Sequence, residues 1–551
     1  MGTPELPVPD GLVLRPFRAV RFAVADLAAV TSPPYDLIGR GDVERLLLSH
    51  PNNVVRLTLP FPAFGPDDPP APVAASGPNG PAGSADPATD TKRPGDSPDP
   101  GDPFIPANAP TPGDTSTFGS APRVDAAPGS TSTPGVDATP GSTSTPGLDA
   151  APSSTGTLGS DASPGPAGAP GPADVRDSGE ASDLVRVLSA GDEKYAEARD
   201  TLRAWLASGI LVVDEHPALY VYEQSGPGVL QRGLIGDVFL AAPEQHIVLP
   251  HEDVMPGPVA DRLALMSTTE ANLEPIFLLY GGGGGPATAL VEEVAATRTP
   301  LTDMRTDDGQ RHRLWAITDP AEVDLVNAGL HDHQALIADG HHRYATYRAL
   351  QRQEHTAHGT NGPWDFGLAL LVDSTAYPPD LKAIHRVIPG LPPTQATARA
   401  KGSWQVHDFA SLAEGLAALE TAPEPSFLLT GEENGACHLL TTPDPLQLSH
   451  AMPADHSPRW NALNTAVLAE FVMPKVWGMR DDEWAVRIVH HDAHTATRLA
   501  IESGGTAVIL NPLKVEEVLA VAALGERVPR KSTSFGPKPR TGLLLRTFAI
   551  D

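Results

Sequence analysis

The sequence predicts an α+β fold of mixed sheets with flanking helices. Strand-like apolar runs and amphipathic helical patterns occur together on both sides of one long stretch rich in proline. That stretch has no apolar face to bury, whereas residues 1–60 and 181–551 suffice for two or three hydrophobic cores. The chain has 551 residues, with 60 prolines and 51 glycines, and only 5% of its residues are aromatic. A single uniformly packed domain is therefore not expected.

The amino-terminal part of the α+β region covers residues 1–61. Ser32-Pro33-Pro34-Tyr35-Asp36 predicts a stiff turn that presents the polar groups of Tyr35 and Asp36. Residues 40–50 carry apolar residues at helical spacing, and residues 53–59 alternate as a strand does.

Residues 62–180 are predicted to be a disordered insertion rich in Pro, Gly, Ser and Thr. The segment 124–135 recurs as 136–147 and, degraded, as 148–159. A 12-residue period of such composition has too little apolar surface to offset the conformational entropy that is lost on ordering. Expansion by tandem duplication is favoured over a partner-binding role.

Residues 181–330 continue the amino-terminal α+β region. The pattern predicts a helix over 192–207 and strands over 210–213, 218–224, 232–241 and 275–280. The glycine run 281–285 has no following Lys-Ser/Thr pair, so a slack turn is favoured over a phosphate loop.

A central unit, expected over 331–400, carries the clearest chemistry. The buried-strand pattern 335–338 leads into Asp339-Gly340-His341-His342-Arg343, and a helix follows over 345–352. A strand–turn–helix junction directs backbone N–H groups and the helix dipole at one point, which suits an anion. Arg343 could fork onto a phosphate or carboxylate. The alternative is that Asp339 caps the helix and the histidines lie on the surface.

The carboxy-terminal α/β segment covers 401–551, with a strand at 508–511 and a helix over 515–523. Near the end, basic residues gather beside two hydroxyls, Ser532 and Thr533, which suits a phosphate. The basic residues are Arg527, Arg530, Lys531, Lys538 and Arg540. A solvated tail is the alternative. His490-His491-Asp492-Ala-His494 has metal-like content, but a loop at a strand end is favoured.

Composition limits the classes of function. The formal net charge of −29 disfavours non-specific nucleic-acid binding. The lone Cys437 excludes a disulfide framework and is expected at a strand start. No signal peptide or membrane-length apolar run is visible, so we expect a soluble cytoplasmic protein without a membrane partner. Protein partners and oligomeric state are not predicted.

Several segments resemble, in order, a bacterial family known as domain of unknown function 1015. Asp339-Gly-His-His-Arg-Tyr344 is similar to its signature, and Ser534 and Gly536 depart from the aromatics expected near the end. The other matching pieces are 15–19, 33–36, 217–224, 250–252 with 261–262, 274–277 and 529–533.

The turn at Asp339 also resembles the phosphate-gripping turn of the ParB/sulfiredoxin-like fold, some members of which phosphorylate free serine with ADP or ATP. This resemblance implies that a nucleotide with Mg²⁺ is bound, with Asp339 as a metal ligand. The residues that would hold phosphate are Gly340, His341, His342, Arg343, Lys531, Ser532 and Thr533. The candidate catalytic carboxylates are Glu252, beside His251, with Asp36 and Asp339 as further candidates.

The leading hypothesis is a nucleotide-dependent phosphotransferase (kinase-like) that acts on a small hydroxylated metabolite, with free serine as one candidate. The alternatives are a ParB-like nucleotide-sensing or DNA-associated binding protein without turnover, and a metal-dependent hydrolase. The hypothesis predicts one site where Asp36, Glu252, the Asp339 turn and Lys531 meet. It also predicts that Arg343→Ala abolishes nucleotide binding with little change in melting temperature.

Overall fold

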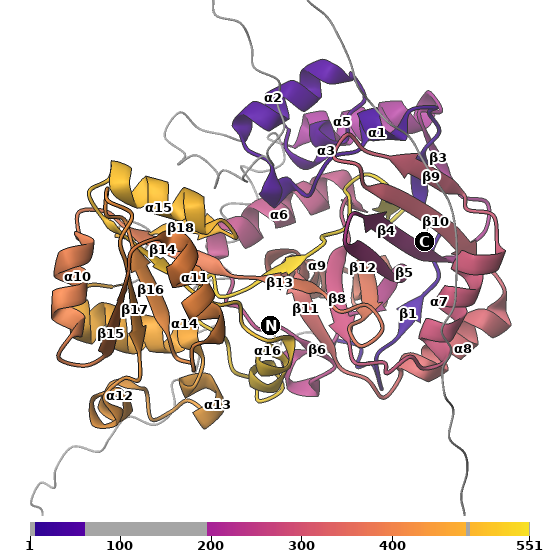
Figure 1. Cartoon of the computed structure of the whole chain (residues 1–551). Helices are drawn as coiled ribbons and strands as arrows, with labels where there is room; N and C mark the ends of the chain where they lie inside the picture. Colours follow the sequence, from indigo (N-terminus) through magenta and orange to yellow (C-terminus); the bar gives the residue numbers. More distant parts are fainter. Residues whose placement is uncertain (1–5, 61–194, 481–484, 550–551) are drawn as a thin grey trace, which may run out of the picture. The chain divides into compact units, whose positions relative to one another are not determined.

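The computed structural model describes residues 6–60, 195–480 and 485–549 (Figure 1). The predicted insertion at 62–180 and the start of the helix predicted from residue 192 lie outside these residues. The α+β class is confirmed, because mixed sheets with flanking helices make up the described chain.

The largest sheet has nine strands and combines parallel with antiparallel neighbours. The order is β6-β11-β8-β12-β5-β4-β10-β9, with β1 paired to β5. Only the pairs β11–β6 and β12–β8 run parallel. The strands are β1 (Leu14–Arg15), β4 (Leu219–Gly226), β5 (Val229–Phe239), β6 (Val248–Leu249), β8 (Ile276–Tyr280), β9 (Thr302–Arg305), β10 (Arg311–Ile317), β11 (Ala335–Asp339) and β12 (Phe366–Asp373).

Both faces of this sheet are buried, as the alternation within β8 shows. Ile276 and Leu278 pack with four helices, whereas Phe277 and Leu279 pack with carboxy-terminal segments. The four helices are α6 (Pro256–Thr269), α7 (Pro286–Thr297), α8 (Pro320–Leu330) and α9 (His341–His358). On the other face lie α13 (Pro458–Asn461) and α16 (Val515–Ala522).

A second sheet of six strands is wholly antiparallel, in the order β15-β17-β16-β19-β14-β18. Cys437 begins β17 and is buried, as predicted. The strands are β14 (Ile384–Ile388), β15 (Gln405–Phe409), β16 (Phe427–Thr430), β17 (Cys437–Thr441), β18 (Arg487–His490) and β19 (Thr506–Ile509). The helical segments beside it are α10 (Pro393–Ala400), α11 (Leu412–Thr421), α12 (Pro445–Ala451), α14 (Asn464–Val467), η4 (Leu468–Trp477) and α15 (Ala493–Glu502).

The last segment of the chain pairs with three earlier segments through short contacts. β20 (Ser534–Gly536) pairs with β13 (Asp380–Lys382), and β21 (Arg546–Thr547) pairs with β7 (Ala271–Asn272). Between them, Thr541 bridges to Ser32. The basic carboxy-terminal segment is thereby held beside the turn at Tyr35 and Asp36.

The strand predicted over 53–59 is wrong, because this segment contains the short helix α3 (Val55–Thr58). Asn53 explains the difference: its Oδ1 accepts a hydrogen bond from Val55 N–H, and its Nδ2 donates to Ala29 O. Val55, Leu57 and Thr58 of α3 are buried, so burial overrides the strand-like alternation.

Of the other predicted amino-terminal elements, the helix over 40–50 is α2 (Arg40–Ser49), the strand over 210–213 is β3 (Leu211–Val213), and α5 (Ala196–Ala207) forms the described part of the helix over 192–207. β3 pairs with β2 (Val20–Phe22). The remaining short elements are α1 (Leu27–Val30), η1 (Tyr35–Leu37), η2 (Pro243–Gln245) and η3 (Pro363–Asp365).

The expected central unit, 331–400, divides between the two large sheets. β11 and β12 belong to the nine-stranded sheet, and β14 belongs to the six-stranded sheet. Its helix begins at His341 instead of residue 345, so the Asp339 turn leads directly into the first turn of α9.

Candidate functional site

The junction between β11 and α9 requires a glycine. Gly340 has φ +93°, and a Cβ at this position would lie 2.9 Å from Ile276 Cγ2. The first hydrogen bond inside α9 runs from Tyr344 N–H to Gly340 O, at 2.9 Å. The backbone N–H groups before Tyr344 have no partner inside the helix. They point out of its amino terminus, which is a geometry that binds anions.

Asp339 does not cap α9; it lies between two cations. Its Oδ1 is 2.6 Å from Lys538 Nζ, and its Oδ2 accepts a hydrogen bond of 2.6 Å from Arg343 Nη2. Lys538 also pairs with Asp36. Burial tends to raise the pKa of Asp339, but Lys538 and Arg343 outweigh it and hold the pKa below its usual value. This contradicts the alternative in which Asp339 is a helix cap.

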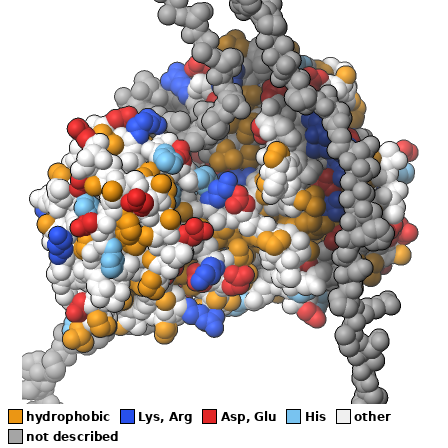
Figure 2. Space-filling view, viewed as in Figure 1, with side chains coloured by type: hydrophobic (Ala, Val, Ile, Leu, Met, Phe, Trp, Pro, Cys, Tyr) orange, Lys and Arg blue, Asp and Glu red, His pale blue; other side chains and the backbone are white. Residues whose placement is uncertain are grey.

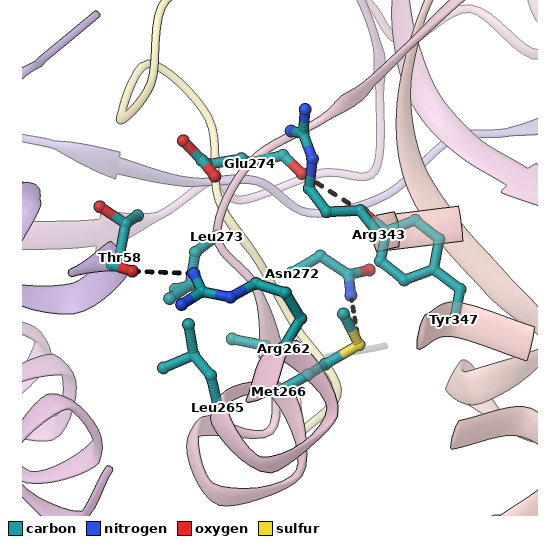
Figure 3. Close-up of a pocket in the computed structure, with 10 residues that line it drawn as sticks. Thr58, Arg262, Leu265, Met266, Asn272, Leu273, Glu274, Arg343 and Tyr347 are labelled. Atoms are coloured by element: carbon teal, nitrogen blue, oxygen red, sulfur yellow. Dashed lines mark hydrogen bonds between the residues drawn. The ribbon is translucent and has the colours of Figure 1, made fainter. Parts of the chain in front are cut away.

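Arg343 points into the protein and is nearly buried. Its Nη1 donates to Pro275 O at 2.6 Å, and its guanidinium lies 5.7 Å from the centre of the Tyr35 ring. Among the described residues, only its Nε has no hydrogen-bond partner, and Arg343 lines a cavity of about 30 Å³ together with Thr58 (Figure 3). A cavity of this size takes about two water molecules. In this arrangement Arg343 braces the turn.

The two histidines after Gly340 fix the loop that follows β6. Nε2 of the buried His341 accepts the His251 N–H at 3.3 Å, and Nε2 of the half-buried His342 accepts the Met255 N–H at 3.1 Å. Burial lowers the pKa of both imidazoles, so they remain neutral near pH 7. The surface position considered for them does not apply to His341.

His251 and Glu252 are joined through the hydroxyl of Thr533. His251 Nε2 lies 2.8 Å from Thr533 Oγ1, which donates to Glu252 Oε1 at 3.2 Å. Burial lowers the pKa of His251 to about 3, so the ring is neutral and its Nε2–H can donate to Thr533. Burial raises the pKa of Glu252, although Lys531 and Thr533 oppose this. Glu252 remains partly open to solvent. A carboxyl of this kind suits proton transfer.

The loop that carries Lys531 is fixed from β14. The buried Arg386 donates through Nη2 to the carbonyl oxygens of Arg530 and Lys531, at 2.9 and 3.0 Å. Lys531 adopts φ +54°, which is unusual for a residue with a side chain, and its side chain is exposed. Ser532 is buried and donates to Pro529 O at 2.6 Å. Ser532 therefore holds the loop, while Lys531 reaches solvent near Glu252.

Beside Lys538 is a cavity of about 290 Å³. Its walls combine apolar and charged groups. They include Pro33, Pro34, Leu37, Val229, Phe535, Pro537, Gln224, Gln310, His312, His491, Ser534, Asp308, Asp380, Lys382, Lys538 and Arg540. This volume is near the lower end for small-molecule pockets. The cavity adjoins the Asp36–Lys538–Asp339 contacts, because Lys538 belongs to both.

The structure thus brings the predicted site residues together from four segments. Asp36 meets Asp339 through Lys538, and His251 meets the α9 turn through His341. The segment after β6 meets the carboxy-terminal segment through Thr533. The catalytic and phosphate-binding roles of these residues remain predictions.

The residues present do not fit a protein-built metal centre. Both oxygens of Asp339 face cations, and no group of three or more His, Cys, Asp or Glu suited to a metal occurs among the described residues. The loop at His490 is a strand end, as predicted: β18 ends there and Asp492 caps α15.

The sequence placed Lys538 only in the basic run that suits a phosphate, and it indicated no role for Arg386. Lys538 belongs to the basic run near the carboxy terminus, but its spacing does not show which lysine reaches Asp339. Arg386 lies in an ordinary strand pattern, and its burial carries no signal in the sequence. The sequence signal for Lys538 was therefore the basic run itself, and for Arg386 there was none.

These features define an α+β protein with a buried polar centre at a strand–helix junction. The family model described as "Protein of unknown function (DUF1015)" matches residues 14–76 and 183–466, and the chain belongs to this family. A search of curated proteins found no match.

Solved structures give remote similarities. A free serine kinase in complex with AMP is 14% identical, with 55% of this chain and 86% of that chain covered and a TM-score of 0.28. SbnI from Staphylococcus aureus, with a C-terminal truncation, is 12% identical, with 57% of this chain and 87% of that chain covered and a TM-score of 0.30. A conserved hypothetical protein from Pyrococcus furiosus is 13% identical, with 58% of this chain and 97% of that chain covered and a TM-score of 0.28. At these scores the similarities do not bear on function or establish the ParB/sulfiredoxin-like fold.

Surface and helix composition give two further findings. Where described residues form the face drawn in Figure 2, acidic and basic side chains are interspersed, without a continuous basic surface. Among the described residues, no helix combines the length and apolar character needed to span a membrane.

Proposed function

We propose that the chain is a nucleotide-dependent phosphotransferase that acts on a small hydroxylated metabolite, with free serine as one candidate. One observation carries the proposal. A half-buried carboxyl with a raised pKa, Glu252, lies in the same cluster of contacts as the amino terminus of α9 and Lys531. Phosphoryl transfer depends mainly on positioning and charge stabilisation, and this cluster supplies groups for both.

The phosphates are proposed to lie between the first turn of α9 and Lys531. Backbone N–H groups of the helix and the ammonium of Lys531 would stabilise their negative charge. Lys538 pairs with Asp36 and Asp339. It therefore contributes to the charge of the centre but is not proposed to contact the phosphates.

Glu252 is the proposed general base. Its carboxylate accepts the proton of the acceptor hydroxyl while that oxygen forms a bond to the terminal phosphorus of the nucleotide. The bond from this phosphorus to the bridging oxygen breaks, and the shortened nucleotide leaves with the electron pair. Thr533 orients Glu252, and His251 orients Thr533.

The first test is a thermal-shift and calorimetric titration with ADP and ATP, with and without Mg²⁺. A nucleotide at 100 times its Kd stabilises the folded state by about 2.7 kcal/mol. Lys531→Ala should weaken nucleotide binding, whereas Lys514→Ala, at an exposed lysine paired with Glu517, should not. Failure of the wild-type protein to bind any nucleotide would refute the proposal.

The second test separates binding from transfer. Glu252→Gln should bind nucleotide as the wild-type protein does, but should lower transfer to a hydroxylated acceptor by roughly 10²- to 10⁴-fold. Small alcohols, hydroxy acids and serine serve as acceptors, and product formation is followed by phosphorus NMR. Nucleotide binding without transfer to any acceptor would instead support the binding protein without turnover.

A further inference from the structure

The charges that line the cavity beside Lys538 are unevenly compensated. Lys382 pairs with Asp380 at 3.0 Å, and Lys538 pairs with Asp36 and Asp339. Arg540 forms no ion pair with any carboxylate in the described part of the chain, although it lines the same cavity. Arg540 is therefore a cation on the cavity wall that pairs with no described carboxylate, and Asp308 on the same wall likewise forms no ion pair among the described residues.

Neutral oxygens hold the Arg540 side chain in place. Nε donates to Thr31 Oγ1 at 2.7 Å, and Nη2 donates to the carbonyl oxygens of Ala28 and Thr31 at 3.3 and 3.2 Å. Nη1 donates to no described residue, and Arg540 is partly exposed. A guanidinium fixed on one side and accessible on the other is pre-organised for an oxyanion.

The surroundings of Arg540 agree with an uncompensated charge. Burial lowers the pKa of Arg540, and the carboxylates that oppose this effect are Asp308 and Asp307. Both are exposed, in the turn between β9 and β10, so solvent screens them. The remaining walls carry prolines and Phe535, which offer apolar contact to the body of a ligand.

We propose that this cavity binds a small organic oxyanion whose phosphate or carboxylate group pairs with Arg540. Both groups present two or more oxygens to a guanidinium, which is the chemistry that the cavity recognises. The apolar walls favour a ligand with a compact apolar part. This site is separate from the phosphate position proposed at α9 and Lys531, and it does not depend on transfer activity.

The experiment measures wild-type stability in inorganic phosphate and in acetate, against sodium chloride at equal ionic strength. We expect at least one oxyanion to raise the melting temperature saturably. Arg540→Met should weaken this binding by about tenfold or more, because it removes a charged donor. Gln310→Glu adds a negative charge to the cavity wall and should weaken binding several-fold. The response to phosphate and to acetate shows which group the site prefers.

Two controls separate this proposal from the proposed function. Gln353→Glu adds the same charge at an exposed position on α9 and should leave oxyanion binding unchanged. The oxyanion binding that Arg540→Met removes should persist in Lys531→Ala. Binding lost in Lys531→Ala but kept in Arg540→Met would overturn the inference and leave the phosphotransferase proposal intact. A wild-type protein without preference for either oxyanion over chloride would overturn it without any variant. If Arg540→Met does not fold, an undiminished oxyanion affinity in Gln310→Glu would also overturn the inference.

Discussion

Replacing Arg343 by alanine should destabilise the protein strongly, in contrast to the expectation from sequence. Arg343 makes a charge-assisted hydrogen bond to Asp339 and a second hydrogen bond to Pro275 O, each 2.6 Å long. Its side chain is 9% exposed, and that of Asp339 is 15% exposed. Removing one partner of a buried pair costs about 3–5 kcal/mol. Lys538 still faces Asp339 in the variant, so we expect a loss near 3 kcal/mol.

The assay is urea unfolding of the purified chain, followed by tryptophan fluorescence. Arg352→Ala is the matched control, because Arg352 lies on the same helix and is exposed. It should change the free energy of unfolding by less than about 0.5 kcal/mol. A loss below about 1 kcal/mol in Arg343→Ala, or an equal loss in both variants, would show that Arg343 does not brace the turn.

Two further predictions concern the same centre. His251 has a pKa of about 3, so the unfolded state takes up its proton first, and stability should fall as the pH drops from about 6.5. His251→Gln should reduce the slope of unfolding free energy against pH, between pH 4.5 and 6, by about 1.4 kcal/mol per unit; an unchanged slope would contradict the neutral ring. Gly340→Ala should lose about 1–3 kcal/mol in urea unfolding, because of its φ of +93° and the close Ile276. Gly41→Ala, in a helix with open space around it, should be neutral or gain up to about 1 kcal/mol, and equal effects would exclude backbone strain at Gly340.

Elements with a single strong period were predictable from the sequence. The apolar run at 335–338 became β11, and the face with Tyr344, Tyr347 and Leu350 is buried in α9. The segment 53–59 was not predictable in this way, because the hydrogen bonds of Asn53 to distant backbone decide its structure. Long-range contacts of this kind leave no local pattern.

The residues of the candidate site were predictable from the sequence, but the contacts between their side chains were not. In the sequence, a turn with Asp339, Gly340 and Arg343 indicates a site that contains charged groups. Which cation meets which carboxylate depends on how the chain end crosses the amino-terminal turn, and Lys538 lies 502 residues from Asp36. Arg343 therefore looked like a ligand-binding residue, whereas in the structure its two Nη atoms hold Asp339 and Pro275.

The charge balance of the centre depends on residues beyond the part of the chain that the family model matches. That part contains Asp36, Glu252 and Asp339, whereas Lys531 and Lys538 lie after its end at residue 466. Lys538 holds the pKa of Asp339 down, and Lys531 opposes the rise in the pKa of Glu252. The carboxy-terminal segment thus sets the protonation of carboxyls that it does not contain. Substitutions there should alter which ligand charges the centre accepts, even where the Asp339 turn is unchanged.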